Sequence, residues 1–193
     1  MSVQETEQRI DDTLAGAPVE YRTPAARPTL AEAQAWCKNL AETHYENFHV
    51  ATRFLPKRLR PHFQTIYAYC RVADDLGDEV GDPALSLELL ASWRAMLDEC
   101  YDAPERSRHP VFVALAETVQ ECAIPREPFA DLLKAFALDQ TKTRYESLAE
   151  LEEYARYSAN PVGRLVLYMA GVNEPRLHRL SDKICTGLQL ANF

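Results

Sequence analysis

Apolar residues recur at helical spacing along most of the chain. Leu85, Leu89, Trp93, Met96 and Cys100, for example, follow one another at steps of three and four residues, which places them on one face of a helix. No run alternates apolar and polar residues for long enough to indicate a β-strand, and the 193 residues include only six glycines. The pattern therefore predicts an all-α protein.

Start and stop signals divide the pattern into seven helices. Capping boxes at Thr29–Glu32 and Ser147–Glu150 mark two starts, and the segment Gly81–Pro83 ends one helix and begins the next. Pro161 and Gly163 predict a kink or break in the sixth helix, because proline lacks the backbone donor. The predicted helices run from about 29 to 49, 61 to 80, 83 to 101 and 110 to 122, then from 128, from 147 and through 177–193.

Residues 1–28 differ from the rest of the chain. They are polar at first and then carry three prolines, which predicts a flexible N-terminal arm before a domain over 29–193. The last predicted helix still shows apolar residues, such as Ile184 and Leu188, and reaches Phe193 without a C-cap glycine. We therefore expect the N-terminal part of a single, C-terminally truncated domain whose remaining helices are missing. A natural terminus that frays is the alternative.

The segment RVADDLGDE, from Arg71 to Glu79, places carboxylates at the end of an apolar helical face. Phe63, Tyr67 and Cys70 recur at steps of four and three, and Asp74 and Asp78 continue the same series. The spacing predicts that both aspartates point toward the interior. Because a buried carboxylate without a partner is costly, we expect either cations opposite them or a polar cavity.

The chemistry of these residues indicates a metal site. Asp74 and Asp78 lie about 6 Å apart along a helix, so both can offer oxygens to the same cation. Oxygen ligands suit Mg²⁺, which binds through one or two carboxylates together with waters and substrate phosphates. Arg71, one turn before Asp75, can pair with the carboxylates or reach a phosphate oxygen. A solvated acidic helix end is the alternative interpretation.

Composition argues against several other classes of protein and site. A net charge of -8 and a pI near 5.2 argue against a general nucleic-acid binder, which needs clustered Lys and Arg. Five scattered cysteines without a CxxC pair suggest neither a disulfide framework nor a zinc site. No apolar run approaches the roughly 18–20 residues of a membrane span. We expect a cytoplasmic protein whose only membrane contact is peripheral, at the inner membrane.

Several motifs together resemble one enzyme family. The stretch IYAYCRVADDLGDE, from Ile66 to Glu79, resembles the first aspartate-rich motif of the squalene and phytoene synthases. These are all-helical enzymes of the isoprenoid synthase fold, with a helical bundle around a central cavity. NFHVATRFLPKRLR, DQTKTRY and YARYSANPVGRLVLYMAG agree with the family in order and spacing, and the resemblance covers about residues 36–193. ENF, DQTKTRY, SANPVGR and QLANF are most similar to the hydroxysqualene synthase branch of bacterial hopanoid biosynthesis.

The resemblance implies roles for particular residues. Asp74 and Asp78 would ligate Mg²⁺ bound to a prenyl diphosphate, with Asp75 beside them, and Arg71 and Tyr67 would contact the diphosphate or its first carbons. The other residues that the resemblance places at the reaction site or around the cavity are Asn47, Phe48, Tyr154, Ser158, Asn160, Gly163, Gln189 and Asn192.

The resemblance also implies a reaction. In the hydroxysqualene synthase branch, presqualene diphosphate ionises and water captures the cation, without NADPH; we expect Ser158 and Asn160 to help hold that water. The alternatives are a head-to-head prenyl transferase that joins two prenyl diphosphates, such as farnesyl diphosphate, and a non-catalytic helical partner of such an enzyme. Partner synthases of the same pathway are expected to accompany it. The 193-residue chain alone is expected to be inactive.

Overall fold

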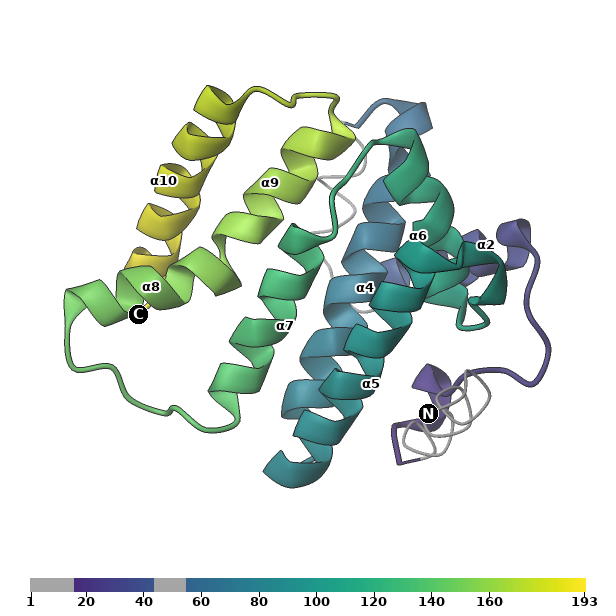
Figure 1. The fold of residues 1–193 in the computed structure, drawn as a ribbon, viewed down its shortest axis with the longest axis horizontal. Helices are drawn as coiled ribbons and strands as arrows, with labels where there is room; N and C mark the ends of the chain where they lie inside the picture. Colours follow the sequence, from purple (N-terminus) through teal and green to yellow (C-terminus); the bar gives the residue numbers. More distant parts are fainter. Residues whose placement is uncertain (1–15, 44–54) are drawn as a thin grey trace.

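The computed structural model describes residues 16–43 and 55–193, and these residues form helices and connecting loops without a β-strand (Figure 1). The all-α prediction is thus confirmed. The α-helices are α2 (Leu30–Thr43), α4 (Arg60–Asp78), α5 (Pro83–Asp102), α6 (Pro110–Glu121), α7 (Glu127–Asp139), α8 (Leu148–Ser158), α9 (Asn160–Met169) and α10 (Pro175–Asn192). Three short 3-10 helices are η1 (Val19–Tyr21), η2 (Lys57–Leu59) and η3 (Pro104–Arg106).

The predicted helix boundaries agree closely with these helices. The predicted break at Pro161 is confirmed, because α8 ends at Ser158 and α9 begins at Asn160. Asp82 caps α5, with its Oδ1 accepting hydrogen bonds from the backbone N–H groups of Ala84 and Leu85. The first predicted helix extends to residue 49, but α2 is described only to Thr43, and the residues beyond it lie outside the described range.

Helix α4 lies at the centre of the bundle. It packs against α2, α5, α6, α7 and α9, and α10 lies on the outer edge against α8 and α9 (Figure 1). Since α4 ends at Asp78 and α5 begins at Pro83, the connection is short and the two helices run antiparallel. Helix α7 runs in the same direction as α4, so the C-terminal ends of these two helices lie at the same end of the bundle, the lower end in Figure 1.

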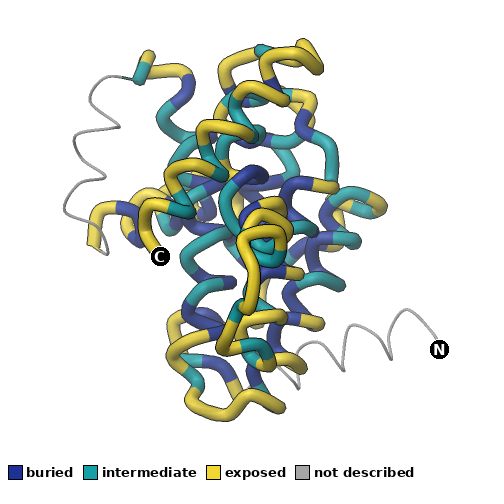
Figure 2. Tube along the Cα trace, turned by 90° about the vertical axis from the view of Figure 1, so that its left-hand side faces the viewer, coloured by how far each residue is buried: buried dark blue, intermediate teal, exposed yellow. Residues whose placement is uncertain are grey.

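An aromatic cluster fills the centre of the core. Tyr69 of α4, Trp93 of α5, Phe112 of α6 and Phe129 of α7 are fully buried. The Trp93 and Phe112 ring centroids are 4.5 Å apart, and those of Tyr69 and Phe129 are 4.9 Å apart, within the range of favourable aromatic pairs. Figure 2 shows buried residues running through the middle of the bundle and exposed residues on its outer turns.

Residues 16–28, expected to belong to a loose arm, pack against the bundle. Ala17 and Tyr21 are buried, and the Arg27 guanidinium donates from Nε to the Ser107 carbonyl at 2.8 Å. Residues 16–28 therefore make both apolar and hydrogen-bond contacts with the bundle. Residues 1–15 lie outside the described range, and the division into an arm and a domain stays a prediction.

The packing of α9 against α10 depends on a glycine. A Cβ atom at Gly163 would lie 2.6 Å from Cys185 Sγ and still closer to Ser181 Oγ, so only glycine allows this approach without a shift. Arg164 and Asp182 form a two-pronged ion pair at 2.8 and 2.6 Å across the same interface. The opposite face of α10 stays exposed within the described part of the chain; its apolar residues are Leu177, Leu180, Ile184 and Leu188.

Candidate active site

The structure corrects the predicted orientation of the aspartates on α4. The face of α4 that enters the core carries Tyr69, Val72 and Leu76, all without exposed surface. Asp74 lies to one side of this face with 42% of its side chain exposed, and Asp78 is exposed. The prediction that both point into the core was wrong. The buried face of α4 runs through Ala68, Val72 and Ala73, and it lies to one side of the series from Phe63 to Asp78.

Asp75, expected beside the metal ligands, is instead the buried carboxylate, with 3% of its surface exposed. Its Oδ1 accepts a hydrogen bond from Arg71 Nη2, and its Oδ2 accepts from Arg71 Nε at 3.1 Å and from the hydroxyl of Tyr21. The remaining terminal nitrogen of Arg71, Nη1, lies 3.4 Å from Asp74 Oδ2. Arg71 thus joins the buried aspartate to the half-exposed one.

Three carboxylates from two helices share one negatively charged region. Burial raises the pKa of Asp74, and the neighbouring Asp78 raises it further, while Arg71 opposes both. Burial also raises the pKa of Asp139 at the end of α7, and the charge of Asp78 adds to this rise. Because the charge of Asp78 acts on both Asp74 and Asp139, a cation bound near Asp78 would lower this repulsion.

Beside this region lies a group of hydroxyls on α8 and the loop before it. Tyr154 donates a hydrogen bond to Asp139 Oδ2 at 2.9 Å. Burial and the Asp139 carboxylate raise the pKa of Tyr154, and the neighbouring Ser158 opposes the rise. The hydroxyls of Tyr145 and Ser158 are buried and have no partner at hydrogen-bond geometry among the described residues. Such hydroxyls can hold a water or a ligand.

The remaining expected residues fall into different settings. Tyr67 is half-buried on α4, on the same side as Asp74. Asn160 is buried, and its Oδ1 accepts a hydrogen bond from Thr186 Oγ1 at 2.9 Å, so it joins α9 to α10. Gly163 permits the close contact of the same two helices, and its expected place on a cavity wall stays a prediction.

The end of α10 lies close to Tyr154. Gln189 is half-buried and Asn192 is exposed. The ring of the adjacent Phe193 is 5.9 Å from the Tyr154 ring and 6.1 Å from the Tyr145 ring. Asn47 and Phe48 lie outside the described residues.

The donor set fits Mg²⁺ only as a partial site. Asp74 and Asp78 supply carboxylate oxygens one helical turn apart, and the charge of Asp78 adds to the rise that burial causes in the pKa of Asp74. No group of three His, Cys, Asp or Glu side chains within 16–43 and 55–193 is placed to hold a metal ion by itself. Because Mg²⁺ commonly keeps waters and substrate phosphates as ligands, two carboxylates suit it without a closed protein cage.

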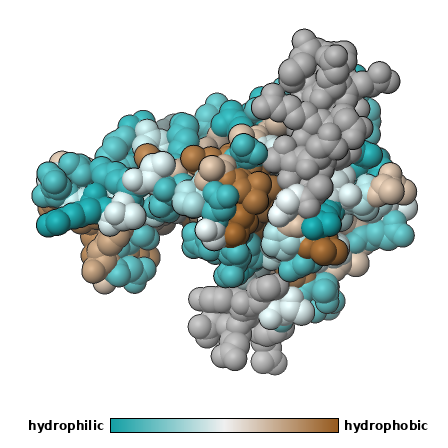
Figure 3. All heavy atoms as spheres, turned by 90° about the horizontal axis from the view of Figure 1, so that it is seen from below, coloured by the Kyte–Doolittle hydropathy of each residue, from teal (hydrophilic) through white to brown (hydrophobic). Residues whose placement is uncertain are grey.

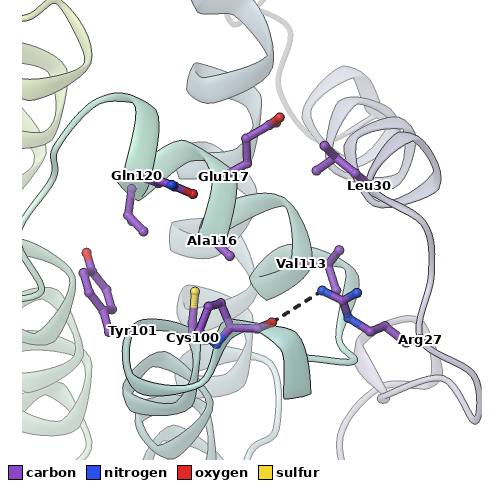
Figure 4. Close-up of a pocket in the computed structure, with 10 residues that line it drawn as sticks. Arg27, Leu30, Cys100, Tyr101, Val113, Ala116, Glu117 and Gln120 are labelled. Atoms are coloured by element: carbon purple, nitrogen blue, oxygen red, sulfur yellow. Dashed lines mark hydrogen bonds between the residues drawn. The ribbon is translucent and has the colours of Figure 1, made fainter.

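A cavity of about 600 Å³ lies elsewhere, between α5, α6 and the segment before α2 (Figure 4). Its wall includes Cys100, Tyr101 and Glu117, and the Arg27 guanidinium at its edge donates to the Pro104 carbonyl at 3.4 Å. It lies toward the C-terminal end of α5, which is the far end of that helix from Asp78. None of the expected site residues lines it.

The end of the bundle that carries the acidic residues is largely polar. Figure 3 views this end and shows mostly hydrophilic atoms around a compact hydrophobic area near the middle.

In the described part of the chain, no helix is both long enough and apolar enough to cross a membrane. The five cysteines lie within the described residues and are all free.

Sequence reasoning missed three residues of this region. Asp139 opens the DQTKTRY motif and ends an apolar helical face, as Asp74 does; this signal was visible in the sequence, but no site role was assigned to the residue. Tyr145 closes the same motif. Tyr21 carries no signal in the sequence, because its contact with Asp75 spans 54 residues.

A helical bundle whose central helix ends in paired aspartates is typical of the isoprenoid synthase fold. Residues 41–193 match the family model described as squalene/phytoene synthase, and the chain belongs to this family. The crystal structure of squalene synthase HpnC from Alicyclobacillus acidocaldarius is similar, with a TM-score of 0.78 and 40% identity, over 93% of this chain and 64% of that one.

Two curated relatives indicate the range of products in the family. A phytoene synthase of Rhodobacter capsulatus is 32% identical over 157 residues, which are 81% of this chain and 46% of that protein. A hydroxysqualene synthase of Rhodopseudomonas palustris is 37% identical over 148 residues, which are 76% of this chain and 49% of that protein. The chain thus spans about half the length of these curated relatives.

Proposed function

We propose that this chain supplies the aspartate-rich side of an enzyme that ionises a prenyl diphosphate with the help of Mg²⁺. The observation that carries the proposal is the negative region of Asp74, Asp78 and Asp139, in which burial raises the pKa of Asp74 and of Asp139 and the charge of Asp78 adds to both rises. A region of this kind is stabilised when a cation binds. Membership of the squalene/phytoene synthase family supports a diphosphate as the other ligand of that cation.

Some of these residues would bind the metal ion, and others would assist ionisation of the prenyl diphosphate. Asp74 and Asp78 would hold the metal ion, and Mg²⁺ would supply charge to neutralise the departing diphosphate. Arg71 Nη1, on the Asp74 side of the guanidinium, would donate to a diphosphate oxygen, and Tyr67 would lie near the first carbons. The carbon–oxygen bond breaks with its electron pair leaving on the diphosphate, and a carbocation remains.

We propose hydroxysqualene as the product, formed from presqualene diphosphate and water. Water adds to the rearranged cation through its oxygen and loses a proton, so the net products are hydroxysqualene, diphosphate and a proton. The buried hydroxyls of Tyr145 and Ser158 support this step, since they offer unused hydrogen-bonding capacity beside Tyr154. Asn160 fits the role less well than Ser158, because Thr186 already donates to its Oδ1.

Head-to-head coupling of two prenyl diphosphates is the second candidate. It is favoured by the phytoene synthase of Rhodobacter capsulatus, which aligns with more of this chain than the hydroxysqualene synthase does. The hydroxysqualene synthase has the higher identity over its shorter alignment. Both candidates use the same aspartates for the first ionisation, so only the product separates them.

The test uses the protein produced from its complete gene, with Mg²⁺ and either presqualene diphosphate or farnesyl diphosphate. Lipid products are identified by mass spectrometry. Hydroxysqualene from presqualene diphosphate, with no product from farnesyl diphosphate, is the expected result. A coupled product from farnesyl diphosphate would move the function to the second candidate, and no product from either substrate would contradict both.

The water-holding role of Ser158 has its own test. Ser158→Ala is expected to lower the share of hydroxysqualene among the products, because the cation then loses a proton or rearranges further before water reaches it. Ser92→Ala is a matched control, since Ser92 is also buried but donates to the Glu88 carbonyl of its own helix. An unchanged product mixture in Ser158→Ala would exclude this role.

A further inference from the structure

Tyr21 is held at both its side chain and its backbone. The residue is 2% exposed, and its hydroxyl donates to Asp75 Oδ2. Its carbonyl lies 3.2 Å from His109 Nε2. His109 Nδ1 accepts a hydrogen bond from the Val111 N–H, and burial lowers the pKa of His109 to about 3. The imidazole is therefore neutral, carries its hydrogen on Nε2 and donates to the Tyr21 carbonyl.

The carboxylate of Asp75 is held by neighbouring side chains. Its two oxygens accept hydrogen bonds from Arg71 Nη2, Arg71 Nε and the Tyr21 hydroxyl. A carboxylate at 3% exposure needs such partners, since an unpaired buried charge is strongly unfavourable. Burial and the adjacent carboxylate raise the pKa of Tyr21, so the hydroxyl keeps its proton and remains the donor.

The contacts of Asp75 set the orientation of Arg71. A guanidinium is planar, so fixing Nε and Nη2 on one carboxylate also fixes the direction of Nη1. Nη1 lies 3.4 Å from Asp74 Oδ2, at the edge of the shared negative region. The direction of this nitrogen therefore depends on where Asp75 holds the other two, and Tyr21 is the additional donor that holds Asp75.

We propose that Tyr21 is a positioning residue that, through Asp75, directs Arg71 toward the metal and diphosphate. The inference rests on the proposed function, because it assigns the segment 16–28 to that same site. Asp75 then acts as a bridge between this segment and Arg71, while Asp74 and Asp78 are the proposed metal ligands on α4. Tyr21 also lies outside the residues 41–193 that the family model matches, so the family motifs do not mark it.

The test measures binding of magnesium pyrophosphate, as a diphosphate probe, by calorimetry on the protein from its complete gene. Tyr21→Phe removes one oxygen and is expected to raise the dissociation constant roughly tenfold, as when a hydrogen bond to a charged group is lost. Tyr101→Phe is the matched control, because the Tyr101 hydroxyl donates to the Ile124 carbonyl at 3.0 Å, far from Asp75. The control is expected to change the constant by less than about twofold.

A double-mutant cycle shows whether the effect passes through Asp75. In an Asp75→Asn background, Tyr21→Phe is expected to cause little further loss of affinity, since the bridge is already weakened. Equal dissociation constants for wild type, Tyr21→Phe and Tyr101→Phe would overturn the proposal. Equal losses in Tyr21→Phe and Tyr101→Phe would overturn it too, because they would indicate a general effect on stability.

Two further measurements keep the outcome decisive. If Tyr21→Phe does not fold, amide hydrogen exchange over residues 17–22 of the wild type replaces it. Coupling is reciprocal, so magnesium pyrophosphate should slow that exchange, and an unchanged rate overturns the proposal.

If the wild type does not bind the probe, the proposed metal–diphosphate site is contradicted. Exchange of the Arg71 Nε–H, measured by NMR, then decides whether Tyr21 holds Arg71: faster exchange in Tyr21→Phe supports it, and unchanged exchange overturns it.

Discussion

Helix α4 has two sides that differ in how complete their contacts are. On one side Tyr69 is fully buried and meets the rings of Trp93, Phe112 and Phe129 at centroid distances of 4.9 to 6.0 Å. On the other side lie Asp74, Asp78 and Asp139; burial raises the pKa values of Asp74 and Asp139, and the charge of Asp78 adds to both rises. The contacts of the first side are complete within the protein, whereas the second side is expected to be stabilised when a cation binds.

Breaking the apolar side should have the largest effect. Phe112→Ala is expected to lower the free energy of unfolding by about 3–5 kcal/mol, because it removes a buried ring and leaves a cavity between three helices. Chemical denaturation followed by circular dichroism measures the change. Phe193→Ala, at a ring that is 64% exposed, is the control and should cost much less. Equal losses would mean that the aromatic cluster is not the main source of stability.

The packing of α9 on α10 gives an intermediate effect. Gly163→Ala is expected to destabilise the fold by about 1–3 kcal/mol, since the new methyl group would overlap Cys185 and Ser181. Gly187→Ala in α10 meets no atom within 4 Å and should stabilise the fold by up to about 1 kcal/mol through helix propensity. Thermal unfolding of both variants compares them. A neutral or stabilising Gly163→Ala would contradict the close approach of α9 and α10 at this position.

The acidic side should show the smallest effect, visible as a pH dependence. The pKa of Asp74 is raised in the folded state above its ordinary value of 3.8, so the folded state binds more protons. The stability contributed by Asp74 is therefore present at low pH and is lost as the pH rises through the raised pKa. Asp74→Asn should gain stability relative to wild type as the pH increases from about 4 to 7.

Glu32 provides a control of opposite sign for that experiment. Hydrogen bonds from Thr29 lower the pKa of Glu32, so its contribution is present above the unfolded pKa and lost as the pH falls. Glu32→Gln should therefore lose stability relative to wild type over the same rise in pH. Denaturant titrations at several pH values measure both variants. If the stabilities of both variants changed in the same direction relative to wild type, the assigned electrostatics would be contradicted. Added Mg²⁺ should reduce the difference in stability between Asp74→Asn and wild type at pH 7.

The sequence allowed the helices to be predicted because their signals are local. The capping box of Thr29 and Glu32, the Asp82 cap and the break at Pro161 depend on residues within one helical turn. The aspartate-rich motif was equally visible. These features require no knowledge of which helices meet.

Orientation and long-range contacts were harder to predict. The buried face of α4 includes small residues, Ala68 and Ala73, that carry little weight in a hydrophobic pattern. Asp75 accepts a hydrogen bond from Tyr21, and Gly163 lies in close contact with α10. Each depends on a partner distant in sequence, which periodicity does not reveal.

The contacts of Tyr21 also set an order of events during synthesis. Tyr21 is made early, but Asp75 lies 54 residues later and His109 lies 88 residues later. At about 5–20 residues per second, the ribosome needs roughly 4 to 18 seconds to add the last of these partners. Until then the N-terminal segment lacks its docking place, so it is expected to remain accessible to chaperones and proteases while α2, α4 and α5 are being made.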